Sequence, residues 1–117
     1  MIRKQSEMQS EIREEMRGGT GAVTIQHYFT SDEFAANARL CAKLRVPPGA
    51  SIGVHKHGAE DEVYIVTHGT GLLNDGETET RVSVGDAILT GNGESHALAN
   101  DGDEPLELIA MIMCYES

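Results

Sequence analysis

Alternating apolar and polar residues along much of the chain predict β-strands. In the clearest example, Leu40, Ala42, Leu44 and Val46 alternate with Cys41, Lys43 and Arg45. Because successive side chains of a strand point to opposite faces, this segment offers one apolar face to a core. Pro47, Pro48 and Gly49 then end the strand.

Further short strands follow at intervals that are typical of an all-β sandwich or barrel. They are expected at residues 21–29, around the histidines at 55 and 57, and at 62–67, 71–74, 78–84, 87–90, 95–99 and 106–115. Asp75-Gly76 is a hairpin signal, and residues 30–34 form a capped turn or a single helical turn.

The N-terminal segment predicts a short helix over residues 6–17. Met8, Ile12 and Met16 recur every four residues, Ser6 and Gln9 have the spacing of a capping box, and Gly18-Gly19 follow as a stop. We therefore divide the chain into a helical extension, residues 1–20, and a β-barrel domain, residues 21–117.

Composition limits the partners of this single domain. The 117 residues carry a net charge of −10, which repels nucleic acid phosphates and anionic lipid. No apolar run reaches the roughly 18–20 residues of a membrane span, and residues 1–6 do not resemble a secretion signal. Two cysteines, Cys41 and Cys114, suit a reducing cytoplasm and are expected to be free thiols.

The candidate chemistry lies in residues 49–69, which hold His55, His57 and Glu62. In an extended chain, residues two apart share a face, so both histidines can bind one ion. Glu62 opens the next apolar run and can enter the same space from the adjacent strand. His96 is available as a third imidazole.

At these residues the chain resembles the cupins. The first cupin motif, G-x5-H-x-H-x3-4-E-x6-G, matches Gly49, His55, His57, Glu62 and Gly69. The second, G-x5-P-x-G-x2-H-x3-N, matches Gly85, Gly93, His96 and Asn100, with Gly91 in place of the proline and hence a less rigid loop. The resemblance implies a small jelly-roll barrel with His55, His57, Glu62 and His96 as metal ligands.

Three imidazoles and one carboxylate suit a divalent Mn, Fe, Ni, Co, Cu or Zn ion. Four ligands leave two positions of an octahedral ion for water, dioxygen or a bidentate substrate. With neutral histidines and an ionised Glu62, the metal and its ligands carry a charge of about +1, which favours a small anionic ligand.

Other residues have weaker claims. Tyr64 shares the strand parity of Glu62, so it either contacts substrate as a catalytic residue or packs in the interior. Asn100 is expected to stabilise a turn. Surface, core or interface positions are expected for the remaining candidates, which are His27, His68, Lys43, Arg45, Met111 and Met113; an anion site at Lys43 and Arg45 is the alternative for that pair.

Two function classes remain open. The first is a metalloenzyme, decarboxylase- or dioxygenase-like, that acts on a small organic acid; among small cupins the chain looks most like those described as oxalate decarboxylase-like. The second is a non-catalytic module that binds or senses a small ligand.

We also expect a homodimer built through residues 6–29, because a lone jelly roll leaves sheet edges to protect. The alternative is a monomer with this segment folded onto its own barrel.

Overall fold

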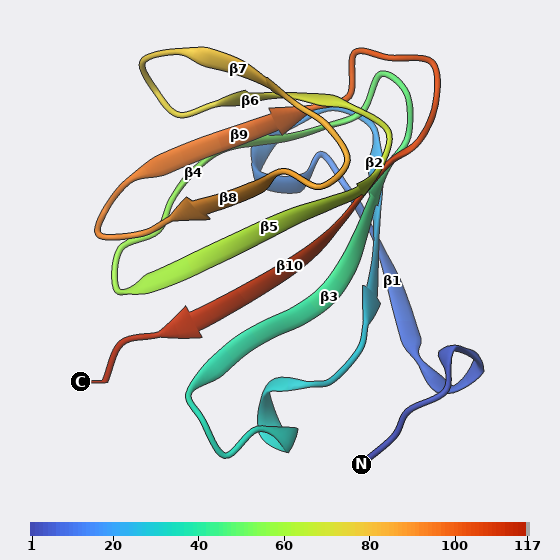
Figure 1. Cartoon of the computed structure of the whole chain (residues 1–117), viewed down its shortest axis with the longest axis vertical. Coiled ribbons are helices and arrows are strands. Elements are labelled where there is room, and N and C mark those ends of the chain that lie inside the picture. Colours follow the sequence, from blue (N-terminus) through green and yellow to red (C-terminus); the bar gives the residue numbers. More distant parts are fainter. Residues whose placement is uncertain (117) are drawn as a thin grey trace.

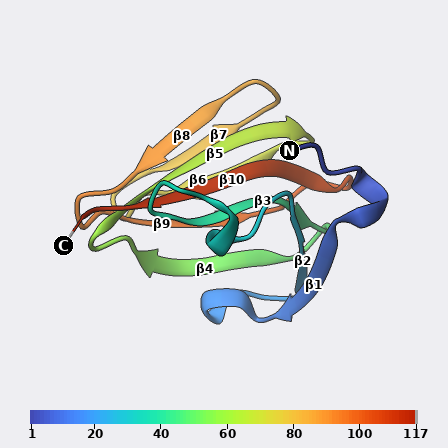
Figure 2. The same cartoon turned by 90° about the horizontal axis from the view of Figure 1, so that it is seen from below.

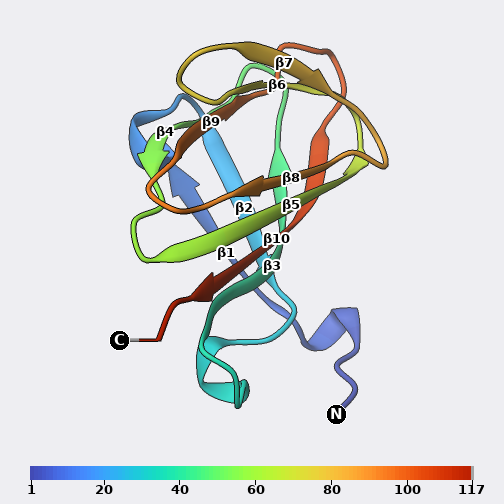
Figure 3. The ribbon, with the colours of Figure 1, turned by 60° about the vertical axis from the view of Figure 1, so that its left-hand side comes forward.

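The computed structural model describes residues 1–116, whose strands form two facing antiparallel sheets (Figure 1). The larger sheet has the order β1 (Gln9–Glu14), β2 (Ala22–His27), β3 (Ala38–Val46), β10 (Leu106–Cys114), β5 (Glu60–His68) and β8 (Ala87–Thr90). The smaller sheet has the order β4 (Ser51–Lys56), β9 (Ser95–Ala99), β6 (Gly71–Asn74) and β7 (Glu79–Val82). In Figure 3 the smaller sheet lies above β8, β5 and β10. The result is a jelly roll.

The core fills the space between the two sheets. On β3 and β10 the buried positions alternate along the strand, as in Ala42, Leu44 and Val46. Lys43 and Arg45 occupy the intervening positions, and the Arg45 side chain is 54% exposed, close to Glu107. These two cations therefore lie on the outer face of the larger sheet, and the expectation of a surface position is confirmed.

The strands predicted from the alternation are confirmed, with small differences at their ends. Residues 71–74, 87–90 and 95–99 match β6, β8 and β9. The Asp75-Gly76 hairpin joins β6 to β7, and a 3-10 turn, η3 (Ser31–Glu33), forms where the capped turn was expected. The Thr30 and Glu33 side chains cap η3 reciprocally.

The helix predicted over residues 6–17 is wrong. That segment contains a 3-10 turn, η1 (Gln5–Glu7), then strand β1, then a second 3-10 turn, η2 (Met16–Gly18). A spacing of four residues is also compatible with one face of a strand, because it is a multiple of two. Antiparallel pairing with β2, with Ile12 opposite Thr24, provides hydrogen-bond partners for the backbone of this segment. This pairing favours the strand over the helix.

The turn η2 packs against the outside of β4, as the blue segment in Figure 2 shows. Added Cβ atoms at Gly19 and Gly53 would overlap the carbonyl oxygens of Ser51 and Arg17, respectively. Only two glycines allow these backbones to approach so closely. Backbone hydrogen bonding from Ser51 N–H to Thr20 O, 2.8 Å, fixes the contact.

Among the described residues 1–116, the helical segments are far shorter and less apolar than a bilayer-spanning helix requires.

Candidate metal centre

A bulge in β4 turns His55 into the interior. Ile52 pairs with Leu98 and His55 pairs with His96, so β4 advances three residues while β9 advances two. The extra residue changes the alternation, and Ile52 and His55 therefore face the same side. His57, two residues further along, shares this side, as the sequence predicts, and is 1% exposed.

Glu62 and His96 come from the two facing sheets. Glu62 lies on β5 of the larger sheet, at the same parity as Tyr64 and Val66, and all three are buried. His96 lies on β9 of the smaller sheet beside Leu98. The sandwich thus brings His96 to three residues that lie 34 to 41 positions earlier in the chain.

Four ligand atoms converge on one point. The Nε2 atom of His96 lies 2.9 Å from His55 Nε2, 3.1 Å from His57 Nε2 and 2.9 Å from Glu62 Oε1. Glu62 Oε1 lies 2.8 Å from His57 Nε2 and 3.6 Å from His55 Nε2. All four atoms lie within 4.8 Å of one another.

This spacing fits a transition metal ion. A metal–nitrogen bond of about 2.1 Å puts adjacent ligands of an octahedral ion about 3.0 Å apart. The separations from His96, 2.9–3.1 Å, match that value. Nitrogen and oxygen atoms rich in lone pairs repel at this distance unless a proton or a cation lies between them. The four residues are therefore a group able to hold a metal.

The far side of each imidazole ring is hydrogen-bonded. His55 Nδ1 lies 2.8 Å from the carbonyl oxygen of Gly53, which can only accept, so the Nδ1 atom carries the proton. His96 Nδ1 lies 2.8 Å from the Thr90 hydroxyl, and His57 Nδ1 lies 2.8 Å from a Glu60 carboxylate oxygen. Such partners fix ring orientation and leave Nε2 free to bind a metal.

The protonation states also suit coordination. Burial lowers the pKa of His96 below its usual value, which keeps this imidazole neutral near pH 7. Burial by itself would raise the pKa of Glu62, but contacts with His55 and His96 outweigh it and hold that pKa below its usual range. An ionised carboxylate and neutral imidazoles are the forms that bind metals.

One loop joins the two halves of the site. His57 N–H donates to Glu94 O over 2.9 Å, and Gly93 N–H donates to His57 O over 2.8 Å. The loop begins at Gly91, where an added Cβ would overlap the carboxylate of Asp61. Tyr115 holds that carboxylate through a hydrogen bond of 2.5 Å. The Gly91 position is thus packed closely against the Asp61 side chain and the Glu60 carbonyl oxygen of β5.

Other candidates from the sequence fall into two groups. Tyr64 is 1% exposed and its ring stacks on the His96 imidazole, so it lies beside the metal group. Burial and the charge of Glu62 raise the pKa of Tyr64 well above its usual value, so the phenol keeps its proton. His27 and His68 lie outside the group; His68 donates to Pro105 O over 2.8 Å.

Asn100 stabilises a turn, as expected. Its side-chain amide donates to Val46 O and Glu104 O over 2.9 and 2.8 Å, and its oxygen accepts from Gly102 N–H over 3.0 Å. The two cysteines, Cys41 and Cys114, are free, also as expected. Met111 is half-buried and Met113 is 37% exposed, on the outer side of β10.

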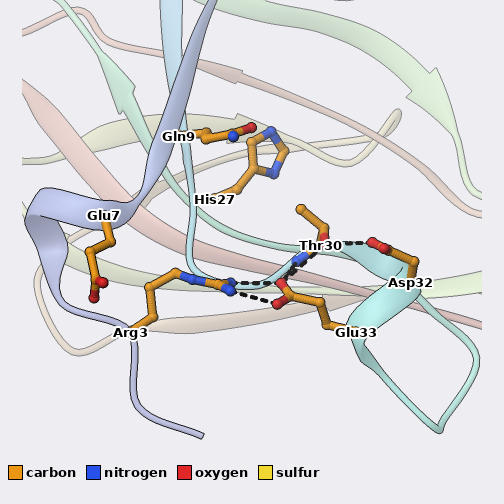
Figure 4. A pocket seen from close by; sticks show the side chains of 7 residues that line it. All are labelled: Arg3, Glu7, Gln9, His27, Thr30, Asp32 and Glu33. Carbon is orange, nitrogen blue, oxygen red and sulfur yellow. Dashed lines mark hydrogen bonds and ion pairs between the residues drawn. The ribbon is translucent and has the colours of Figure 1, made fainter.

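A separate cavity of about 240 Å³ lies near the N-terminus. Figure 4 shows the side chains that line it, including Arg3, His27 and Glu33. Arg3 lines this cavity. Its guanidinium donates to both carboxylate oxygens of Glu33, over 2.6 and 2.5 Å, and to the carbonyl oxygen of Tyr28 over 3.0 Å. The same guanidinium lies 5.4 Å from the centre of the Phe29 ring. This cavity shares no lining residue with the four-ligand group, and we interpret it as the anchor of the N-terminal segment.

Sequence reasoning missed the residues behind the ligands. Glu60 and Thr90 contact the ligand imidazoles, and Arg39 contacts Glu60. The parity that Glu60 shares with Glu62 is a signal in the sequence. Arg39 and Thr90 carry no comparable signal. The strand order of the larger sheet brings Arg39 to Glu60, and the packing of the two sheets brings Thr90 to His96.

The two-sheet jelly roll, with three histidines and a glutamate facing its interior, is the arrangement of a cupin that has a group able to hold a metal. The cupin domain family matches residues 42–112, more than half of the chain, and the chain therefore belongs to the cupin family.

Individual relatives agree with this assignment. The chain is 37% identical over 113 residues to a protein of Thermotoga maritima named "oxalate-binding protein", a match that covers 97% of this chain and 93% of the relative. A crystal structure of a "predicted oxalate decarboxylase" from Thermotoga maritima has a TM-score of 0.92 and 37% identity, covering 97% and 99% of the two chains. The polyketide cyclase RemF of Streptomyces resistomycificus shares the fold, with a TM-score of 0.78, 18% identity and coverage of 99% and 81%.

Proposed function

We propose that His55, His57, Glu62 and His96 hold one divalent transition metal ion and that this centre binds a small dicarboxylic acid of the oxalate class. The observation that carries the proposal is the convergence of the four ligand atoms, all within 4.8 Å of one another. The bound ion would be Mn, Fe, Ni, Co, Cu or Zn, since the group offers nitrogen and oxygen but no thiolate.

The charge of the centre selects an anion. A divalent ion with one ionised Glu62 and three neutral imidazoles leaves a local charge of about +1 inside a chain whose net charge is −10. When bound, the ion supplies a Lewis acid that polarises coordinated oxygen. The name of the Thermotoga relative, oxalate-binding protein, supports a dicarboxylate as the ligand.

A second candidate is a metalloenzyme, decarboxylase- or dioxygenase-like, acting on the same class of acid. It is favoured by the similarity to a predicted oxalate decarboxylase and by the position of Tyr64 beside His96. In this candidate Tyr64, whose raised pKa keeps its hydroxyl protonated, would donate a hydrogen bond to the substrate and keep its proton. Carbon dioxide release from oxalate by the metal-loaded protein distinguishes the enzyme from the binding module.

Metal content and oxalate titration test the proposal. Protein purified without chelators is expected to contain up to one equivalent of metal, and His57→Ala and His96→Ala are expected to lose it. His68→Ala is the matched control, because His68 lies outside the group and is exposed. Full metal content in both ligand variants contradicts the metal site, and oxalate binding that persists equally after chelation contradicts the ligand site.

We further propose that the chain forms a homodimer through its N-terminal third. In the structure, β1 pairs with β2 of its own chain and ends the larger sheet, and all six of its residues are exposed. Such an edge strand offers backbone groups for pairing with a second copy. Light scattering tests this: Ile12→Glu, at a side chain 70% exposed on β1, is expected to give a monomer, and Val84→Glu, at one 63% exposed elsewhere, is the control. A wild-type monomer contradicts the proposal.

A further inference from the structure

The three ligand imidazoles differ in what lies behind them. His55 has a main-chain carbonyl behind it and His96 has a hydroxyl, both of which are uncharged. His57 alone has a carboxylate, that of Glu60, at 2.8 Å from Nδ1. A hydrogen bond to an ionised acceptor is shorter and about twice as strong as one between neutral groups.

Arg39 holds the Glu60 carboxylate from the other side. Its Nε atom donates to Glu60 Oε2 over 3.0 Å and its Nη2 atom donates to Glu60 Oε1 over 2.8 Å. This bidentate arrangement fixes the plane of the carboxylate as well as its position. One carboxylate oxygen, Oε1, thereby accepts from both Arg39 and His57.

The fold brings Arg39 to Glu60 across an intervening strand. β3 and β5 are separated by β10 in the larger sheet. The pairing of β3 with β10 shifts between Ile112 and Met113, whose partners are Leu40 and Ala38, so Arg39 is the unpaired residue of a bulge. Bulges re-aim side chains. In this way β3, which contributes none of the four ligands, reaches the metal group.

We propose that Glu60 and Arg39 are positioning residues for the metal centre: Glu60 keeps the proton of His57 on Nδ1 and the Nε2 lone pair toward the metal, and Arg39 holds Glu60 in that place. This inference rests on the proposed metal site. Removal of such a partner of a metal-ligating histidine costs about 10–100-fold in metal affinity.

The exposure of the pair separates this role from a purely structural one. The Arg39 side chain is 46% exposed and that of Glu60 is 16% exposed. Ion pairs of this kind contribute about 0–1 kcal/mol to stability. If the pair were only structural, its removal would change neither the stability nor the metal affinity appreciably. If it positions His57, its removal lowers the metal affinity while the protein remains folded.

Co²⁺ titration of the full chain provides the first measurement. Glu60→Ala is expected to weaken Co²⁺ binding by about 10–100-fold and Arg39→Ala by less, about 3–10-fold, because Glu60 itself remains. Glu60→Gln keeps a hydrogen-bond acceptor without the charge, and its Co²⁺ affinity is expected to lie between those of Glu60→Ala and the wild type. This variant replaces Glu60→Ala in the test if Glu60→Ala does not fold. The d–d absorption of bound Co²⁺ reports any change in the ligand geometry.

Arg81→Ala is the matched control. Arg81 makes a similar bidentate pair with Asp101, at 3.0 and 2.7 Å, with side chains 50% and 40% exposed. Its loss removes one cation from the same acidic chain and is expected to leave Co²⁺ affinity unchanged. If Arg81→Ala weakens binding as much as Arg39→Ala, the loss is not specific to the contact with Glu60 and the proposed role of Arg39 is wrong.

Nitrogen NMR of the histidine rings in metal-free protein separates failure of this inference from failure of the proposed function. His57 is expected to carry its proton on Nδ1 in the wild type and to shift toward the Nε2 form in Glu60→Ala. If the wild type binds no Co²⁺ but this tautomer change occurs, the metal site fails and the positioning contact stands. If Co²⁺ affinity and tautomer are both unchanged in Glu60→Ala and Arg39→Ala, the positioning role is overturned.

Discussion

The Tyr64 ring lies almost parallel to the His96 imidazole, with 4.8 Å between the ring centroids and 16° between the planes. Of the four residues of the candidate metal group, His96 lies closest to the other three, and Tyr64 covers one face of it. The orientation of His96 thus depends on an aromatic ring on one side and on the Thr90 hydroxyl at its edge.

Substitution of Tyr64 separates the ring from the hydroxyl. Tyr64→Phe retains the stacked ring and is expected to hold Co²⁺ within about threefold of the wild type, whereas Tyr64→Ala opens a cavity and costs about 3–5 kcal/mol of stability. Co²⁺ titration and urea unfolding measure the two effects. Loss of metal by Tyr64→Phe would show that the hydroxyl, rather than the ring, supports the site. Loss of oxalate turnover alone would support the Tyr64 hydroxyl as a hydrogen-bond donor to the substrate.

Metal binding is expected to stabilise the fold. Because the ion binds the folded site only, a hundredfold excess over the dissociation constant adds about 2.7 kcal/mol. For a chain of this size the melting temperature should rise on the order of 10 °C. Calorimetric scans with metal and with chelator measure the shift, and Glu62→Gln should show a smaller one. Equal melting temperatures with and without metal in the wild type would contradict specific binding to the folded state.

Metal affinity and stability should both decline as the pH falls below about 6.5. Each histidine must be neutral to coordinate, so protons compete with the metal below the usual histidine pKa. In the metal-free protein, burial lowers the pKa of His96. The unfolded chain then takes up a proton near pH 6.5 that the folded chain does not, and the free energy of unfolding decreases from that pH downward.

Co²⁺ titrations and urea unfolding at about pH 7.5 and about pH 5.5 test both effects, with the metal-free protein used for the unfolding arm. His68→Ala is again a suitable control, since it removes a histidine outside the group. A metal affinity that is constant between about pH 5 and pH 8 would count against histidine ligation.

Gly53→Ala should disturb the site through the backbone. The added Cβ would overlap the carbonyl oxygen of Arg17, so either η2 or β4 must move. Gly53 also supplies the carbonyl oxygen that accepts from His55 Nδ1. We expect a loss of about 1–3 kcal/mol in stability together with weaker metal binding.

Gly58→Ala is the control for this substitution, because an added Cβ there has no atom within 4 Å. It is expected to change stability by no more than about 0.5 kcal/mol. Thermal unfolding and Co²⁺ titration of the two variants give the comparison. Similar metal affinity in Gly53→Ala and the wild type would mean that the close packing of η2 on β4 does not support His55.

Local patterns in the sequence were enough to predict the strands and the four residues of the candidate metal group. The alternation in residues 40–46 and the turn residues at Asp75-Gly76 are local signals, and they suffice for a strand and a hairpin because each depends on a few neighbouring residues. The spacing of His55 and His57 likewise required only that the chain be extended. Glu62 and His96 followed from their places in the two motifs.

Tertiary structure decided the features that depend on contacts distant along the chain. The spacing of Met8, Ile12 and Met16 fits a helix or a strand, and pairing with β2 selected a strand for residues 9–14. Met8 precedes this strand and Met16 lies in η2. The bulge that turns His55 inward depends on the register of β4 with β9 and on the contact of η2 with Gly53. Arg39 reaches Glu60 only because β3, β10 and β5 are neighbours in one sheet. Sheet register and strand order are set by packing of the whole core, so no local pattern of residues contains them.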